Sequence, residues 1–262
     1  MQSGHLSYQS NSVHYLRFGT GEQLLVALHG FGDRARMFAV LEPALAKKYT
    51  VVALDLPFHG QTEWQSDTFS KADLLTIIGQ VLEKEGKSCF CLMAFSFGAR
   101  LAQAMLPDLI DRLDKLYLLS PDGIKTKGMS TAVRVPMWAR RLTRRALRKP
   151  DWFIRLVRTG ARMHLVPGLI VHFLSSNLTR PDRFRRTFGC WLSLDSFYLR
   201  RRRIRAILRE SGLPTDVFFG EKDEMIRFKT LKKMTDGLPN VRLFLLDEGH
   251  RVVGEQLAEM MA

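Results

Sequence analysis

The sequence predicts an α/β fold in which a mostly parallel, doubly wound sheet carries an inserted, all-helical cap. Two observations predict this class. Short, almost wholly apolar segments alternate with segments of helical periodicity, which is typical of parallel strands that are buried on both faces. Between residues 124 and 211 the strand patterns stop and helical spacing takes over. We therefore expect residues 1–123 and 212–262 to form one core and residues 124–211 to form the cap.

The predicted strands are short apolar runs, several of them rich in β-branched residues, and each is too short for a typical helix. In chain order they are residues 12–19, 24–29, 50–56, 88–95, 115–120, 216–219 and 241–246. The predicted helices lie between them, where apolar residues recur every three or four positions. They are residues 34–49, 69–86, 97–112 and 228–237, with a terminal helix from residue 253.

Length and composition exclude several classes of protein. The 262 residues are 46% hydrophobic and 25% charged, which is ordinary for a globular chain and excludes wholesale disorder. No run of about 18 apolar residues exists, which excludes a membrane-spanning helix. The polar start of the chain lacks the apolar stretch of a secretory signal, and an odd count of three cysteines indicates a reducing compartment. We therefore expect a cytoplasmic protein.

The positive charge is concentrated in one segment. The chain has a formal net charge of +14, but residues 124–211 hold 22 Lys and Arg against 4 Asp and Glu, a net of +18. The predicted core therefore carries a net of −4. Three interpretations of the basic cap remain open: a solvated face, a site for an anionic substrate, or peripheral contact with an anionic membrane. We expect no nucleic-acid partner, because the chain has no nucleic-acid-binding motif.

Two short motifs follow predicted strands. Residues 94–98 (AFSFG) place Ser96 between a strand and a helix, with a small residue two positions away on either side, as a sharp strand-to-helix turn requires. The helix behind Ser96 begins with unpaired N–H groups. Residues 29–32 (HGFG) also follow a strand, and their glycines allow a backbone N–H to face a developing oxyanion. Both motifs suit nucleophilic attack on a carbonyl group.

Two further motifs follow the last two strands. Asp223 lies in residues 219–223 (FGEKD), and His250 lies in residues 248–250 (EGH). The chain order is therefore serine, aspartate, histidine, each after the carboxyl end of a strand. Ligands bind at this edge in open α/β sheets, and the order is a known arrangement of a catalytic triad.

These motifs together resemble the α/β-hydrolase fold family. Residues 55–60 (DLPFHG) strengthen the resemblance, since the family's turn after an early strand usually reads D-x-P-G-H-G; here Phe58 replaces the usual glycine. The resemblance covers residues 12–123 and 212–262, and it implies that residues 124–211 are the family's variable helical cap.

The resemblance also implies roles for single residues. Ser96 corresponds to the nucleophile, His250 to the base and Asp223 to the carboxylate that orients the base. The backbone N–H groups of Phe31 and Phe97 correspond to the oxyanion hole. No cofactor or metal is implied.

Other residues remain alternatives for these roles. His29 and His59 belong to turn motifs that the family uses structurally, but each is a rival for the base. Glu221, Glu224 and Asp122 are rivals for the acid. The remaining histidines are less suited to catalysis, because they lie near the start of the chain, before the motifs, or in the cap: His5, His14, His164 and His172.

The expected function is a serine hydrolase that forms an acyl-enzyme from a small ester or thioester, with an anionic substrate as one of the open alternatives. Arg100, four residues after Ser96, resembles an arginine of the menaquinone-pathway synthase of this fold, which eliminates pyruvate. That resemblance makes Arg100 a candidate substrate-binding residue, and the carbon–carbon bond hydrolases suggest Trp191 as another. A non-catalytic ligand-binding or membrane-docking module is the alternative of a different class. The oligomeric state is left open.

Overall fold

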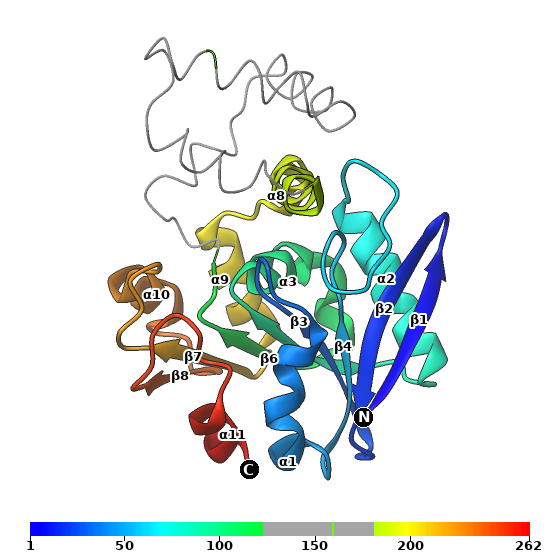
Figure 1. The fold of residues 1–262 in the computed structure, drawn as a ribbon. Helices are drawn as coiled ribbons and strands as arrows, with labels where there is room; N and C mark the ends of the chain where they lie inside the picture. Colours follow the sequence, from blue (N-terminus) through cyan, green and yellow to red (C-terminus); the bar gives the residue numbers. More distant parts are fainter. Residues whose placement is uncertain (123–158, 160–180) are drawn as a thin grey trace.

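The computed structural model describes residues 1–122, 159 and 181–262, and an eight-stranded sheet runs through these parts of the chain (Figure 1). The strand order is β1-β2-β4-β3-β5-β6-β7-β8. The strands are β1 (Gln2–Tyr8), β2 (Asn11–Phe18), β3 (Gln23–Leu28), β4 (Tyr49–Leu54), β5 (Phe90–Phe95), β6 (Leu113–Leu119), β7 (Thr215–Gly220) and β8 (Val241–Leu246). β1 and β2 pair antiparallel, β2 pairs antiparallel with β4, and all other neighbours are parallel. The predicted fold class is confirmed.

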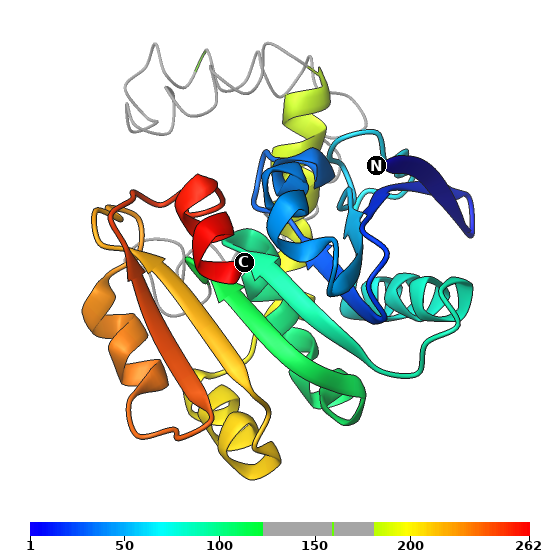
Figure 2. The same ribbon diagram turned by 90° about the horizontal axis from the view of Figure 1, so that it is seen from below.

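Helical segments cover both faces of the sheet (Figure 2). One face packs against α2 (Lys71–Lys84), α3 (Phe97–Leu109), α9 (Arg201–Ser211) and α10 (Phe228–Thr235). The other face packs against the 3₁₀ helix η1 (Ala35–Leu41), α1 (Glu42–Leu45) and α11 (Glu255–Met261). The central strands β3, β4, β5 and β7 are buried almost throughout because side chains on both of their faces meet a layer of helices.

The structure differs from the sequence prediction at two places. The segment predicted as one helix over residues 34–49 is instead η1 followed by the single turn of α1. Pro43 lies in that first turn and has no N–H to donate, so it cannot continue a helix from the preceding turn. Strand β1 was not predicted, because only its Leu6 and Tyr8 side chains are buried at this edge of the sheet.

The described end of the predicted cap packs directly on the core. It comprises α8 (Pro181–Ser193), a short 3₁₀ helix η3 (Leu194–Phe197) and α9. The backbone N–H of Phe69 donates to the Ser193 hydroxyl at 2.8 Å, and the Phe69 and Phe197 rings lie 5.3 Å apart. In α9 the buried side chains are the apolar ones, whereas Arg202 and Arg203 are exposed. Residues 124–158 and 160–180 lie outside the described residues, so the extent of the cap stays a prediction.

Phe58, which departs from the family's usual glycine, contributes to this packing. Its φ is +67°, in the region where glycine is the least strained residue. Its ring lies so close to α8 that a Cβ on Gly189 would come within 2.6 Å of it. The larger side chain therefore fills space between the core and α8. Among the described helices, none is both long and apolar enough to cross a membrane.

Candidate active site

Ser96 occupies a strained turn between β5 and α3. Its φ is +47° and its ψ is −111°, a conformation that non-glycine residues rarely adopt. The turn is held by neighbouring backbone: Ser96 N–H donates to the Leu119 carbonyl at 2.9 Å. The Ser96 carbonyl accepts from the N–H groups of Arg100 at 3.2 Å and Asp122 at 3.3 Å. This conformation points the hydroxyl away from the helix and toward the loop that follows β8, where His250 lies.

Steric contacts explain why the predicted turn motif ends in a glycine, Gly98. A Cβ on Gly98 would overlap the carbonyl oxygens of Leu28 and His29. Helix α3 can therefore begin against the end of β3 only if this position has no side chain. The close approach brings the start of α3 beside the segment that contains Phe31.

A continuous hydrogen-bonded chain joins the three predicted triad residues. His250 Nε2 lies 2.8 Å from the Ser96 hydroxyl oxygen, and His250 Nδ1 lies 2.7 Å from Asp223 Oδ2. Asp223 follows β7 and His250 follows β8. A Cβ on Gly220 would overlap the Gly249 carbonyl oxygen, so a glycine at the end of β7 lets these two loops approach each other.

The Asp223 carboxylate is held in its ionised form. Its side chain is fully buried, and this burial by itself raises the pKa. The hydrogen bond from His250 and the N–H groups of Ile226 and Met225, which donate at 3.0 and 2.8 Å, outweigh burial and lower the pKa of Asp223 below its usual value. An ionised carboxylate only accepts, so His250 Nδ1 donates to it. In the neutral imidazole, the lone pair of Nε2 then faces the Ser96 hydroxyl, as a general base requires.

Phe31 and Phe97 place two unpaired backbone N–H groups near Ser96. Phe97 is the first residue of α3, and Phe31 lies in the turn after β3, where Asp33 N–H donates to the Gly30 carbonyl at 3.1 Å. Within the described residues, neither Phe31 N–H nor Phe97 N–H has a hydrogen-bond partner. Their rings meet edge to face, with centroids 6.2 Å apart. The two amides are thus free to donate to a ligand oxygen.

The two rival histidines of the turn motifs bind backbone. His29 Nδ1 donates to the Gly30 carbonyl at 2.7 Å, and its Nε2 accepts from Leu56 N–H at 3.0 Å. Burial, followed by the neighbouring His59, lowers the pKa of His29 well below its usual value. His59 Nδ1 donates to the Pro57 carbonyl at 2.9 Å, and burial lowers its pKa to about 4. Both rings fix the shape of turns.

The other histidines lie apart from the triad or cannot be assigned. His14 is paired with Asp55 at 2.7 Å, and His5 contacts the Ser12 hydroxyl at 2.9 Å. His164 and His172 lie outside the described residues.

The three rival acids lie in surroundings that differ from those of Asp223. Glu221 and Glu224 are exposed, whereas Asp122 is buried and lies 3.6 Å from the Arg100 guanidinium. Arg100 thus has its charge compensated inside the protein. The cavity beside it, of about 10 Å³, has room for a single water at most.

Trp191, in α8, is half-buried and packs edge to face on Phe188, with ring centroids 6.0 Å apart. Among the described residues, no hydrogen bond joins either predicted substrate-binding side chain to the triad.

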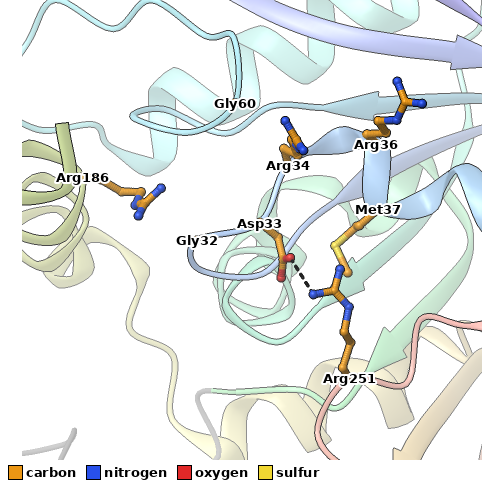
Figure 3. A pocket seen from close by; sticks show the side chains of 8 residues that line it. All are labelled: Gly32, Asp33, Arg34, Arg36, Met37, Gly60, Arg186 and Arg251. Atoms are coloured by element: carbon orange, nitrogen blue, oxygen red, sulfur yellow. Dashed lines mark ion pairs between the residues drawn. The ribbon is translucent and has the colours of Figure 1, made fainter.

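A larger pocket is lined in part by residues next in sequence to His250 and Phe31, and the sequence analysis did not predict it. Its volume is about 620 Å³ (Figure 3). It is lined by Gly32, Asp33, Arg34, Arg36, Met37, Gly60, Arg186 and Arg251. Of its four arginines, only Arg186 comes from the predicted cap. The available signals were the position of Arg251 directly after the triad histidine, and of two arginines shortly after the glycine turn.

Comparisons with known proteins agree with this fold. A family model described as "alpha/beta hydrolase fold" matches residues 23–255. The chain is similar to the uncharacterized hydrolase YugF of Bacillus subtilis, with 24% identity over 96% of this chain and 92% of YugF. A thermophilic esterase from Thermogutta terrifontis, solved with malate bound, superposes with a TM-score of 0.71 at 16% identity, covering 100% of this chain and 96% of the esterase.

A third similarity is local. The dihydrolipoyllysine-residue acetyltransferase component of the acetoin cleaving system of Cupriavidus necator is 33% identical over 112 residues. The match covers 42% of this chain and 30% of that protein, so the chain spans less than a third of that relative's length.

Proposed function

Because the chain belongs to the alpha/beta hydrolase fold family, we propose that it is a serine hydrolase that cleaves carboxylic esters or thioesters. The hydrogen-bonded chain from Ser96 through His250 to Asp223 carries the proposal. A hydroxyl, a base with a free lone pair and an ionised carboxylate are the groups that acyl transfer to serine requires.

In the first half of the proposed reaction, the Ser96 oxygen attacks the substrate carbonyl carbon while His250 Nε2 takes the hydroxyl proton. The negative charge that develops on the carbonyl oxygen is stabilised by the N–H groups of Phe31 and Phe97. Asp223 stabilises the imidazolium that forms. The bond to the leaving alcohol or thiol then breaks, and His250 returns its proton to that group.

In the second half, water attacks the acyl-enzyme. His250 takes a proton from the water, the same two amides bind the oxyanion, and the Ser96–acyl bond breaks as His250 reprotonates Ser96. The product is the free carboxylic acid. Each proton that His250 takes is given back, so the enzyme is regenerated without a cofactor.

The surroundings of Arg100 count against the pyruvate-eliminating synthase, whereas a carbon–carbon bond hydrolase of the same fold stays an alternative. The resemblance to the pyruvate-eliminating synthase depended on this arginine, whose charge is instead compensated by Asp122. The ready alignment of the triad counts against a non-catalytic scaffold, because strain at Ser96 would serve no purpose there.

Hydrolysis of p-nitrophenyl butyrate and of butyryl thioesters by the purified chain tests the proposal. We expect turnover by the native protein, and mass spectrometry should detect a butyryl group on Ser96 when the reaction is quenched early. Ser7→Ala, which changes an exposed serine at the far edge of the sheet, is the matched control for Ser96→Ala. Equal rates for native protein and Ser96→Ala would refute the nucleophile.

A further inference from the structure

The pocket beside the triad collects four arginines from three separate segments (Figure 3). Arg34 and Arg36 lie at the start of η1, Arg186 reaches in from α8, and Arg251 follows the last strand. Segments far apart in the sequence thus place guanidinium groups around one space of about 620 Å³. This volume is typical of a site for a small molecule.

The pocket is adjacent to the reacting groups along two segments. Arg251 directly follows His250, and Gly32 directly follows Phe31, whose N–H is one of the proposed oxyanion donors. The Arg186 guanidinium lies over the Phe31 ring, 6.0 Å from its centroid. The pocket therefore borders residues next to the proposed base and next to one proposed oxyanion donor.

The charges of the pocket are not balanced within the described residues. Asp33 is the one carboxylate among the lining residues, and it pairs with Arg251 at 3.2 Å. Arg34, Arg36 and Arg186 have no carboxylate partner in the described parts of the chain, and the buried Nε of Arg186 has no hydrogen-bond partner there. Neighbouring unpaired cations repel one another, so an anion bound among them gains both attraction and relief of that repulsion.

The shape of the pocket suits a bulky anion. Gly32 and Gly60 lie on its wall, and a Cβ on Gly32 would meet no atom within 4 Å, so the wall is open at this point. Guanidinium forks bind phosphate and carboxylate oxygens in pairs. A phosphate has three terminal oxygens and can satisfy several arginines at once, whereas a carboxylate has only two.

We propose that this pocket binds a phosphate-bearing part of the substrate, so that the enzyme acts on esters or thioesters that carry two or more phosphate charges. The choice of scissile bond rests on the function proposed above, but anion binding by the pocket does not. The pocket would hold the charged end while the carbonyl group lies at Ser96.

Calorimetry tests the pocket independently of turnover. The Ser96→Ala protein is titrated with pyrophosphate and, separately, with succinate as a carboxylate probe. We expect pyrophosphate to bind at least about tenfold more tightly than succinate. Adding Arg34→Ala and Arg36→Ala should weaken pyrophosphate binding by about tenfold to a hundredfold, since hydrogen bonds to charged groups are individually strong.

The matched control for charge is the pair Arg202→Ala and Arg209→Ala, two exposed arginines of α9 outside the pocket. This pair should leave pyrophosphate affinity unchanged within about twofold. Equal weakening by both pairs would mean a general charge effect and overturn the proposal. Pyrophosphate binding no tighter than succinate binding would overturn the preference for phosphate.

Kinetics with matched thioesters tests whether the pocket serves the reaction. Butyryl-coenzyme A carries phosphate charges, and butyryl-N-acetylcysteamine has the same thioester without them. We expect the double variant Arg34→Ala, Arg36→Ala to have a KM about tenfold or more higher for the first substrate, and a several-fold smaller change in kcat/KM for the second. Equal effects on both substrates would overturn the proposal. If the native protein cleaves neither substrate, the thioesterase function fails while calorimetry still decides anion binding.

Discussion

Charge is compensated differently in the proposed triad and in the arginine pocket. In the triad, Asp223 accepts from His250 and from two backbone N–H groups, so its negative charge is fully satisfied inside the protein. In the pocket, Arg34 and Arg36 have no carboxylate partner among the described residues. We infer from this difference that the proposed triad is organised before substrate arrives, whereas the proposed anion site is completed by an external anion.

Removing the nucleophile is the strongest test of the triad. We expect Ser96→Ala to lower kcat/KM for an ester by about 10⁴-fold or more, because members of a triad act as a unit. The melting temperature should change little, because the hydroxyl makes no cap for α3, its one hydrogen bond to His250 is only partly buried, and alanine keeps the same backbone strain. Ester kinetics and thermal unfolding measure the two effects. A loss of less than tenfold would place the nucleophile elsewhere.

The substitution Asp223→Asn removes the negative charge of this side chain and keeps its shape nearly the same. The amide would favour the wrong tautomer of His250, so we expect kcat to fall by about 10³–10⁴-fold while substrate affinity is kept. The free energy of unfolding, measured as a function of pH, gives a second readout. Because the pKa of Asp223 is depressed in the folded state, its stabilising effect is present above the unfolded pKa and is lost as the pH falls through the folded pKa.

The stability advantage of the native protein over Asp223→Asn should therefore narrow in acid. An advantage that grows as the pH falls would contradict the assignment of an ionised carboxylate. Glu224→Gln, at an exposed neighbouring acid, is the control and should leave both kcat and the acid profile unchanged.

Gly98→Ala tests whether the site depends on close backbone packing. The added methyl group would meet the carbonyl oxygens of Leu28 and His29, so we expect a loss of about 1–3 kcal/mol in the free energy of unfolding. Gly79→Ala in α2 is the matched control, because a Cβ there meets nothing within 4 Å. It should stabilise the protein by about 0.5–1 kcal/mol. Denaturant unfolding of both variants gives the comparison, and equal changes would refute the steric argument.

Ionic strength should affect the kinetics that depend on the pocket and those that depend on the proposed triad differently. This is the smallest of the expected effects. Raising ionic strength from about 0.05 to 0.5 M should increase KM for butyryl-coenzyme A by about threefold to tenfold, because exposed charges are screened. The kcat value, set at the half-buried proposed triad, should change by less than about twofold. An equal response of the neutral thioester would remove the distinction between the regions.

The departures from prediction have both local and tertiary causes. The β1 strand has only two buried side chains, so its pairing with β2 gave little hydrophobic signal. The break between η1 and α1 depends on one proline in a segment whose apolar spacing is otherwise helical. Arg100 was a candidate for substrate binding from its spacing to Ser96, but the fold places Asp122 beside it.

The sequence by itself determined the alternation of strands and helices and the strand-end positions of Ser96, Asp223 and His250. It could do so because apolar periodicity and turn chemistry are local, and because the carboxyl ends of parallel strands meet at one edge of the sheet. Counting charge along the chain pointed to residues 124–211 as the basic region. Only the tertiary structure decided that Arg34, Arg36 and Arg251 of the core join Arg186 in one pocket, since electrostatic interaction depends on distance in space and not on separation in sequence.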